Sequence, residues 1–320
     1  MIRISYLVTL YNKSAFLPYV LAGLQAQQGE FEREFIFVDD GSTDDTLVEL
    51  RRQTAGWADP VIIITQANAG PAFAFNAGLA RATGAWLKPV DGDDVLMPWA
   101  TAALLDGVSR HGADLAVGLN AKMGYLPGAE LTPEALLARN PDPGGDPVVL
   151  AKPFERSLRR AHSNPSCWMA RTDLVRSTGG CDVQVFTQDY SLELRLTFRA
   201  RAVAYTPRPL FVAPEAAAGR LSDNEAQILH DLNMAMAGFL ETTPGLSVAQ
   251  TMKAYRRCFG RAWSWARRHN GQKPLSREHR RYLLALLPWN GLSPQKLRES
   301  TAAFRAHFPV RLPKAPPPAG

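Results

Sequence analysis

The first 120 residues alternate short apolar runs with segments of helical periodicity. Apolar residues at the i, i+3, i+4, i+7 spacing predict helices over Leu17–Leu24, Leu47–Leu50 and Phe75–Ala82. The intervening runs predict five strands: Ile2–Leu10, Glu34–Val38, Val61–Thr65, Trp86–Val90 and Asp114–Gly118. Strand–helix–strand repetition of this kind produces a mostly parallel sheet flanked by helices on both faces. The predicted fold class is therefore α/β.

After Leu119 the pattern is less regular. Asn140–Pro147 is turn-rich, and a strand, a helix and a strand are predicted beyond it over Cys167–Ala170, Asp189–Arg201 and Ala202–Tyr205. From Ser222 onward only helices are predicted: Ser222–Glu241, Ser247–His269, Ser276–Leu287 and Ser293–Phe308. We predict an α/β domain over residues 1–220, an all-helical extension over 221–312 and a disordered proline-rich tail over 313–320.

The composition argues against secreted and membrane-spanning classes. The three cysteines are odd in number and far apart, which is typical of reduced thiols in the cytoplasm and excludes a disulfide scaffold. The apolar start at Met1–Leu10 is too short for a signal peptide, and no other run has the length of a transmembrane helix. We expect a cytoplasmic protein.

Acidic residues follow two of the predicted strands directly. Asp39-Asp40 follows the second, and Asp91-Gly92-Asp93-Asp94 follows the fourth. Open α/β sheets bind ligands beyond the carboxyl ends of their strands. Asp39-Asp40 followed by Gly41-Ser42 is also good turn chemistry, and Ser42 with Asp45 predicts a capping box for the next helix.

The second acidic cluster predicts a metal site. Asp91, Asp93 and Asp94 repel one another unless a cation lies among them. Mg²⁺ and Mn²⁺ take oxygen ligands of this kind, usually one or two carboxylates together with substrate phosphate. A solvated acidic turn is the alternative.

Five motifs in register resemble one enzyme family. They are Tyr11-Asn12, the acidic turn from Asp39 to Asp44, Asn68 to Gly70, Asn76 to Gly78, and Asp91 to Asp94. Together they resemble the nucleotide-sugar domain of the family 2 glycosyltransferases, which have the GT-A fold. The resemblance covers roughly residues 1–210 and is strongest up to Asp94.

The resemblance implies roles for individual residues. Thr9 and Tyr11 would line the nucleoside pocket, and Asp39 would bind the base, usually uracil. Asp189 corresponds to the catalytic base, with a helix N-cap as its alternative role. Asp91, Asp93 and Asp94 correspond to the DXD motif that holds the diphosphate through Mn²⁺ or Mg²⁺. The whole implied nucleotide-binding set is Thr9, Tyr11, Asp39, Asp40, Ser42, Asp44, Asn68, Gly70, Asn76, Asp91, Gly92 and Asp93.

The family chemistry is an inverting transfer of a sugar from a nucleotide diphosphate donor, expected here to be a UDP-sugar. A carboxylate takes the proton from the acceptor hydroxyl as the new bond forms, and a metal neutralises charge on the leaving diphosphate. By the resemblance, the acceptor is a glycan or a lipid-linked glycan of bacterial surface polysaccharide.

Three departures from the family pattern favour an alternative. Gln188 stands where a glutamate is common, and Cys181 replaces an aromatic residue. The stretch Pro207–Asp223 has no histidine where many members carry a metal ligand, although Glu215 or Asp223 could substitute. The alternative is a catalytically impaired scaffold or binding protein.

Two other classes fit less well. A nucleotidyltransferase would be expected to have a glycine-rich basic loop after the first strand, where this chain has Leu10-Tyr11-Asn12-Lys13-Ser14. A phospho-receiver domain places its acidic pair after the first strand and Lys-Pro after the last. Here the acidic pair follows the second strand, and Lys88-Pro89 lies within the fourth.

The basic charge is concentrated near the carboxyl end. Residues 250–320 contain 15 lysines and arginines against two acids, while the whole chain has a net charge of +6. An apolar stripe over Met252–Ala266, with Trp265 off the stripe, predicts one of two partners for this helix. The first is an anionic membrane surface at the inner face of the membrane, and the second is the main domain. No nucleic-acid partner is expected, because no recognised binding motif accompanies the charge.

Overall fold

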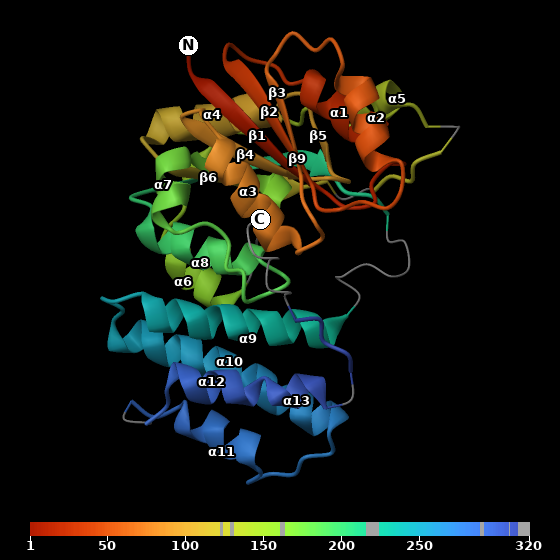
Figure 1. The fold of residues 1–320 in the computed structure, drawn as a ribbon. Helices are drawn as coiled ribbons and strands as arrows, with labels where there is room; N and C mark the ends of the chain where they lie inside the picture. The colour runs from red at the N-terminus through yellow and green to blue at the C-terminus, as the bar shows by residue number, and fades with distance from the viewer. Residues whose placement is uncertain are drawn as a thin grey trace.

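The computed structural model describes residues 1–121, 124–128, 131–160, 164–215, 224–288, 291–306 and 308–312. Its centre is a nine-stranded sheet with the strand order β3-β2-β1-β4-β8-β6-β9-β5, in which β7 pairs with β9 (Figure 1). The strands are β1 Arg3–Leu10, β2 Glu32–Asp39, β3 Val61–Thr65, β4 Trp86–Asp91, β5 Val95–Leu96, β6 Leu115–Asn120, β7 Val148–Val149, β8 Trp168–Arg171 and β9 Val203–Val212.

The predicted mostly parallel sheet is confirmed for the longer strands. β3, β2, β1 and β4 are mutually parallel neighbours. β8 is antiparallel to both β4 and β6, and β9 is parallel to β6, so six strands run in one direction. The two-residue strands β5 and β7 were not predicted, because such short segments have no measurable periodicity.

β9 extends beyond the predicted Ala202–Tyr205. The predicted strand was too short because Pro207 and Pro209 argue against a strand when only the sequence is considered. Its pairing with β6 shifts register between Val117 and Asn120, and this irregularity accommodates residues that cannot donate a ladder hydrogen bond.

The predicted helices around the sheet are present. α3 packs on β1 and β2, and α4 packs on β6 and β9. The helices of this part are α1 Leu17–Gln25, α2 Thr46–Thr54, α3 Pro71–Arg81, α4 Ala100–His111, α5 Pro133–Ala138, α6 Pro153–Arg159, α7 Thr172–Ser177 and α8 Asp189–Arg199, with a 3₁₀ turn η1 at Pro165–Cys167.

The predicted capping box at Ser42 is wrong. α2 begins at Thr46 with Asp45 as its N-cap residue, and no side chain caps it in that way. The Ser42 hydroxyl instead accepts a hydrogen bond from the Asn12 backbone N–H (2.9 Å), because it serves the loop after β1 rather than the helix.

The carboxyl-terminal third is helical, as predicted. Its helices are α9 Glu225–Thr242, α10 Val248–His269, α11 Arg277–Leu284, α12 Pro294–Ser300 and α13 Ala302–Arg305. Figure 1 shows them stacked beyond one end of the sheet, with α6 and α8 lying between. The predicted helix Ser293–Phe308 is two short helices that meet at Thr301. The proline-rich tail 313–320 lies outside the described residues.

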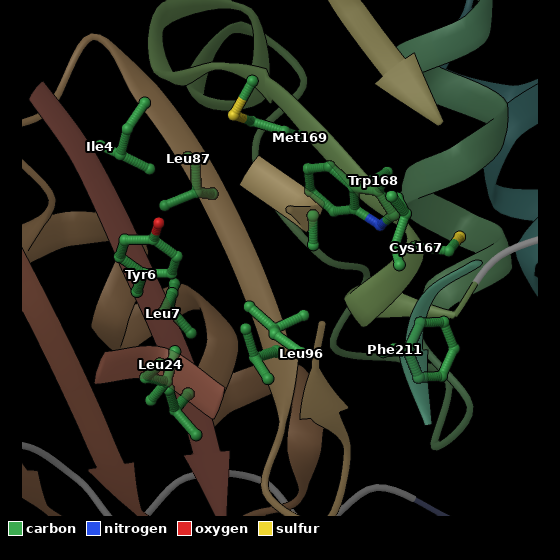
Figure 2. Close-up of a cluster of buried hydrophobic side chains, with 14 of the residues drawn as sticks. Ile4, Tyr6, Leu7, Leu24, Leu87, Leu96, Cys167, Trp168, Met169 and Phe211 are labelled. Atoms are coloured by element: carbon green, nitrogen blue, oxygen red, sulfur yellow. The ribbon is translucent and has the colours of Figure 1, made fainter. Parts of the chain in front are cut away.

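The main hydrophobic core lies on both faces of the sheet, between the strands and the helices that cover them. Figure 2 shows side chains of β1, β4, β5 and β8 meeting in it, among them Ile4, Leu87, Leu96 and Met169. The Tyr6 ring stacks on Phe35 with centroids 5.2 Å apart. Near-continuous burial along β1 and β2 is typical of parallel strands covered by helices on both sides.

A second core joins α6 and α8 to the helical extension. Phe154, Leu158 and Tyr190 lie in one buried cluster with Phe239 and Phe259. The boundary at residue 220 stays a prediction, since α6 and α8 contribute to this cluster although they precede it. No helix among the described residues is both long and apolar enough to cross a membrane.

α10 packs against α6, α9, α11, α12 and α13. Because α6 precedes residue 220, this packing agrees with the predicted alternative in which the helix contacts the main domain. The expected position of Trp265 off the apolar stripe is wrong, because its ring is buried against Phe304 and Phe308. α13 and the segment just after it thus cover a side of α10 that an isolated stripe does not reveal.

A buried carboxylate ties β2 to the loop before β4. Glu34 accepts hydrogen bonds from the Thr83 backbone N–H and hydroxyl (both 2.6 Å), from the Gly84 N–H (3.0 Å) and from the Ser5 hydroxyl. Burial acts to raise the pKa of Glu34, but these hydrogen bonds outweigh it and hold the pKa below its ordinary value.

We therefore expect Glu34→Gln to lower the free energy of unfolding by about 1–3 kcal/mol at pH 7, because buried donors lose an ionised acceptor. A lowered folded-state pKa stabilises the fold above the unfolded-state pKa of about 4.3, and this stabilisation is lost as the pH falls through the folded-state value. Urea unfolding between pH 3 and pH 7 should show a shallower pH dependence in Glu34→Gln than in the wild type.

The matched control is Glu32→Gln on the same strand, whose side chain is exposed and pairs with Arg3. Its stability should change by no more than about 0.5 kcal/mol. Equal effects of the two substitutions would contradict the role assigned to Glu34.

Candidate functional site

The strand register brings the predicted acidic residues to one edge of the sheet. Leu10 at the end of β1 lies opposite Asp39 of β2, and Thr9 lies opposite Asp91 of β4. The end of β1 is therefore flanked by an aspartate on each side. A Cβ on Gly92 would lie 2.6 Å from the Thr9 carbonyl oxygen, so the loop after β4 packs directly on β1 and leaves no room for a side chain there.

The loop after β4 concentrates negative charge. Burial, together with the charge of Asp93, raises the pKa of Asp91 to about 7. Burial and the charges of Asp91 and Asp93 raise the pKa of Asp94 well above its ordinary value. Asp94 Oδ2 is buried and has no hydrogen-bond donor among the described residues. This cluster is therefore costly unless positive charge approaches it.

Two lysines approach this cluster from opposite sides. The Lys13 ammonium, in the loop after β1, forms an ion pair with Asp93. Lys88 of β4 is completely buried and donates to the carbonyl oxygens of Pro89 (2.9 Å) and Ser166 (2.8 Å). Burial lowers the pKa of Lys88 to about 7, although the charges of Cys167, Asp94 and Asp91 act in the opposite direction. Lys88 was not predicted as part of the site.

The residues present suit a divalent cation whose remaining coordination positions are filled by a bound substrate and water. Among the described residues, no group of three or more histidine, cysteine or acidic side chains has the arrangement of a complete metal site. Asp91, Asp93 and Asp94 nevertheless supply hard oxygen donors, and Asp94 Oδ2 has no hydrogen-bond partner among residues 1–121, 124–128 and the other described segments. Mg²⁺ sites commonly use one or two carboxylates and take their remaining ligands from phosphate and water.

Asp39 and Asp40 are adjacent and buried, but their surroundings differ. Both oxygens of Asp40 accept hydrogen bonds: Oδ1 from Gln66 Nε2 (2.7 Å) and the Ala69 N–H (2.9 Å), and Oδ2 from the Gly70 N–H (2.8 Å). Asp39 Oδ1 is buried with no partner among the described residues. Asp40 thus holds the loop after β3, while Asp39 has an oxygen available for a ligand.

The loops after β1 and β2 are tied together by the predicted residues. Asn12 has a left-handed backbone (φ 54°), and its Oδ1 accepts from the Thr43 N–H at 2.8 Å. Asp44 accepts from the Ser14 hydroxyl (2.8 Å) and the Thr46 N–H (3.0 Å). Asp44 and Ser42 therefore shape the rim of the site, where the Tyr11 side chain is 45% exposed.

The loop after β3 completes the second wall. Asn68 is exposed, and Gly70 has φ 100°, a value that L side chains rarely adopt. A Cβ on Gly70 would lie 3.8 Å from the Phe186 ring, which precedes Asp189 by three residues. The loops around Gly70 and Asp189 are therefore neighbours.

Asn76 does not have a free amide group. Its Nδ2 donates to the Cys181 carbonyl oxygen (3.0 Å), and its Oδ1 accepts from the Cys181 N–H (2.8 Å). A Cβ on Gly180 (φ 74°) would lie 2.3 Å from Asn76 Oδ1, so the turn can approach α3 only with glycine there. Asn76 fixes this turn, and Cys181 is buried beside it.

Asp189 is the first residue of α8, and Gln188 is the N-cap residue without a side-chain cap bond. The alternative role of Asp189 as an N-cap is therefore wrong. No residue in the described part of the chain donates a hydrogen bond to its carboxylate. Burial and the charges of Asp91 and Glu193 raise the pKa of Asp189 well above its ordinary value, which places its carboxylate near Asp91.

Sequence reasoning missed the support of the Asp189 loop by α9. The carboxylate of buried Asp231 accepts from the Thr187 backbone N–H (2.8 Å), from Gln227 Nε2 (2.8 Å), and contacts His230 Nδ1 (2.8 Å). The sequence signal that could have indicated this support is the adjacent pair His230-Asp231, at positions that the helix buries.

The residues considered as substitutes for the missing histidine are only partly visible. Asp223 lies outside the described residues. Glu215 is exposed, and its N–H donates to the Tyr125 carbonyl oxygen (2.7 Å). The Tyr125 hydroxyl in turn donates to the Asp93 carbonyl oxygen (2.8 Å), so Glu215 lies near the cluster without a contact to its carboxylates.

Comparison with known sequences finds a family match in the first part of the chain. Residues 5–127, which include every predicted residue up to Asp94, match the profile of "Glycosyl transferase family 2". This part of the chain is thus similar to the family 2 glycosyltransferases. An uncharacterized glycosyltransferase of Nostoc sp. is 37% identical over 99 residues, which are 30% of each chain. The succinoglycan biosynthesis protein ExoO of Rhizobium meliloti is 32% identical over 142 residues, 43% of this chain and 39% of that one.

The matched segments thus span about a third of the length of these curated relatives. Solved structures extend the likeness in fold beyond the matched residues. TarS 1–349 of S. aureus, determined with UDP-GlcNAc, has a TM-score of 0.61 at 18% identity and covers 89% of this chain and 79% of its own. The mannosyltransferase PcManGT of Pyrobaculum calidifontis, determined with GDP-Man and Mn²⁺, has a TM-score of 0.59 at 15% identity over 95% and 85%. The expected GT-A type fold is confirmed.

The adjacent aspartates Asp39 and Asp40 give a matched pair of substitutions. Asp40→Asn should lower the free energy of unfolding by about 1–3 kcal/mol, because three donors lose an ionised acceptor. Asp39→Asn should leave it within about 0.5 kcal/mol of the wild type, since Asp39 Oδ1 has no partner to lose.

The same variants should differ in ligand binding. Calorimetry with UDP should show at least about tenfold weaker binding for Asp39→Asn, a loss of about 1.4 kcal/mol. A large loss of stability in Asp39→Asn with unchanged UDP affinity would contradict the assignment.

Proposed function

We propose that this chain is an inverting glycosyltransferase that transfers a sugar from a UDP-sugar to a hydroxyl of a glycan or lipid-linked acceptor. One observation carries the proposal. Asp39, with an oxygen that has no partner among the described residues, and the acidic cluster after β4 flank the carboxyl end of β1, and the charge of Asp91 in that cluster acts on the carboxylate of Asp189. The similarity of residues 5–127 to family 2 supports the reaction class.

The donor side lies between β1, β2 and the loop after β3. Asp39 offers a buried acceptor for an N–H of a base, and the exposed Tyr11 ring flanks the opening. Thr9, Ser42, Asp44 and the loops around Asn68, Gly70 and Asn76 would shape the nucleotide pocket. We favour uracil because its N3–H is a single donor suited to one carboxylate oxygen.

The diphosphate would lie over the loop after β4. Asp93 and Asp94, with Asp91 behind them, would hold Mn²⁺ or Mg²⁺ together with the diphosphate oxygens. When bound, such a cation neutralises charge on the leaving group without requiring a proton. Lys13 already contacts Asp93, so its ammonium is placed to contact the diphosphate as well. Gly92 keeps the loop close enough to β1 for this.

Asp189 would act as the general base. Its carboxylate has no donor among the described residues, it is the first residue of α8, and the charge of Asp91 in the acidic cluster acts on it. Burial and the charges of Asp91 and Glu193 raise the pKa of Asp189, and a raised pKa increases the basicity of the carboxylate that receives the acceptor proton. Attack by the acceptor oxygen opposite the leaving diphosphate inverts the anomeric carbon.

The acceptor is proposed from two lines of support. The related ExoO protein bears the name of a polysaccharide, succinoglycan, which suggests a glycan. The cationic extension would permit peripheral contact with an anionic membrane carrying a lipid-linked acceptor. The missing histidine leaves a non-catalytic scaffold as the second candidate function.

The test is release of UDP from a panel of UDP-sugars in Mn²⁺, with and without acceptor mixtures. Asp189→Asn should lower the rate by about 10²–10⁴-fold with UDP affinity unchanged, since only the proton acceptor is removed. Asp93→Ala should lower both the rate and the UDP affinity.

Asp173→Asn, on the exposed surface of α7, is the control and should match the wild type. UDP binding without release of UDP from any sugar donor would favour the scaffold. Full activity in Asp189→Asn would remove Asp189 from the mechanism.

A further inference from the structure

The helical extension contains a cationic groove that the sugar-transfer site does not explain. It has a volume of about 870 Å³ and lies between α6, α9 and α10, with Tyr282 of α11 on its wall. Eight lysine and arginine side chains line it, six from α10 and two, Arg159 and Arg160, from the end of α6 and just beyond it. Glu225 is the one acidic residue in its lining.

Most of these cations form no ion pair within the part of the chain that the structure describes. Arg268 pairs with Glu225 at 3.0 Å, but none of the other seven forms an ion pair with a residue that the structure describes. Burial and the nearby charge of Arg159 lower the pKa of Lys253, and burial and the charge of Arg261 lower the pKa of Arg257. The cations therefore repel one another, and a bound anion would relieve the repulsion.

The shape of the groove favours a chain-like anion over a flat surface. Its walls include apolar side chains, among them Leu158, Leu229 and Trp263, between the cations. A planar bilayer would meet only the rim of such a hollow. A chain of sugars and phosphates could enter it, with sugar faces against apolar walls and phosphates against the guanidinium groups.

The groove also adjoins the helix that carries the proposed base. The Arg261 guanidinium lies over the Tyr190 ring at 5.9 Å, and Tyr190 directly follows Asp189 in α8. The Tyr190 hydroxyl donates to the carbonyl oxygen of Ser157 in α6 (3.0 Å), which connects the groove wall to this helix. Asn164 and Ser166 follow α6 in the chain, and their side chains contact the carboxyl group of Asp94.

We propose that this groove binds an acceptor chain bearing phosphate groups and guides it toward Asp189. The inference rests on the proposed glycosyltransferase function and specifies its acceptor as an anionic, phosphate-containing glycan or polymer. Arginine suits the task because its planar guanidinium donates two parallel hydrogen bonds to one phosphate.

The experiment uses the full chain and a fluorescein-labelled linear polyphosphate as the probe, followed by fluorescence anisotropy. The double variant Arg256→Glu/Arg257→Glu should bind it at least about tenfold more weakly than the wild type, with a smaller dependence on salt. Both positions are exposed, so the fold should persist, and Arg256→Gln/Arg257→Gln provides a milder second variant. Arg280→Glu, exposed on α11 and outside the groove, is the matched control and should bind like the wild type.

Two further measurements separate the outcomes. UDP affinity should be equal in all variants, so failure of UDP binding would count against the donor site and leave the groove result standing. Co-sedimentation with phosphatidylglycerol vesicles distinguishes a membrane surface. Vesicle binding that depends on Arg256 and Arg257, without polyphosphate binding, would overturn the proposal in favour of a membrane contact. Equal polyphosphate binding by the wild type and the double variant would overturn it outright.

Discussion

The crowding of carboxylates at the end of β4 is the constraint on which the rest of the site depends. Asp91, Asp93 and Asp94 lie within four residues of one another, and burial together with the neighbouring carboxylate charges raises the pKa of Asp91 and of Asp94. Such an arrangement is unstable without positive charge. The fold supplies Lys13 from the loop after β1 and buried Lys88 from β4 itself, yet Asp94 Oδ2 has no hydrogen-bond partner in the part of the chain that the structure describes. This is the basis of the proposal that the loop receives a cation together with its phosphate ligand.

Much of this arrangement could be predicted from the sequence, because parallel strands buried on both faces are recognisable as apolar runs and their carboxyl ends share one edge. That reasoning correctly located Asp39 and Asp91 at the same edge of the sheet, on the two strands that flank β1. It could not separate Asp39 from Asp40, since two identical adjacent residues differ only in which backbone N–H groups reach them. The capping role predicted for Ser42 was wrong because its hydrogen-bond partner, Asn12, lies 30 residues away in the chain and cannot be identified from local sequence.

The helical extension was predicted as helices but not as part of the site. An apolar stripe shows that a helix is packed and does not identify its neighbour, so burial of Trp265 and the contact of Asp231 with the Asp189 loop were both missed. Through Thr187, α9 fixes the backbone just before Asp189, and through Arg261, α10 reaches Tyr190 just after it. The extension therefore sets the position of the proposed base, and truncation at residue 220 would remove that support.

The central claim is that the acidic loop after β4 binds a nucleotide diphosphate through a divalent cation. Isothermal titration of the wild type and Asp93→Ala with UDP, in Mn²⁺ and in chelator, tests it most directly. The account predicts binding in the wild type with Mn²⁺, and binding at least about tenfold weaker when either the metal or the Asp93 carboxylate is removed. UDP affinity that is the same in all four conditions would contradict it.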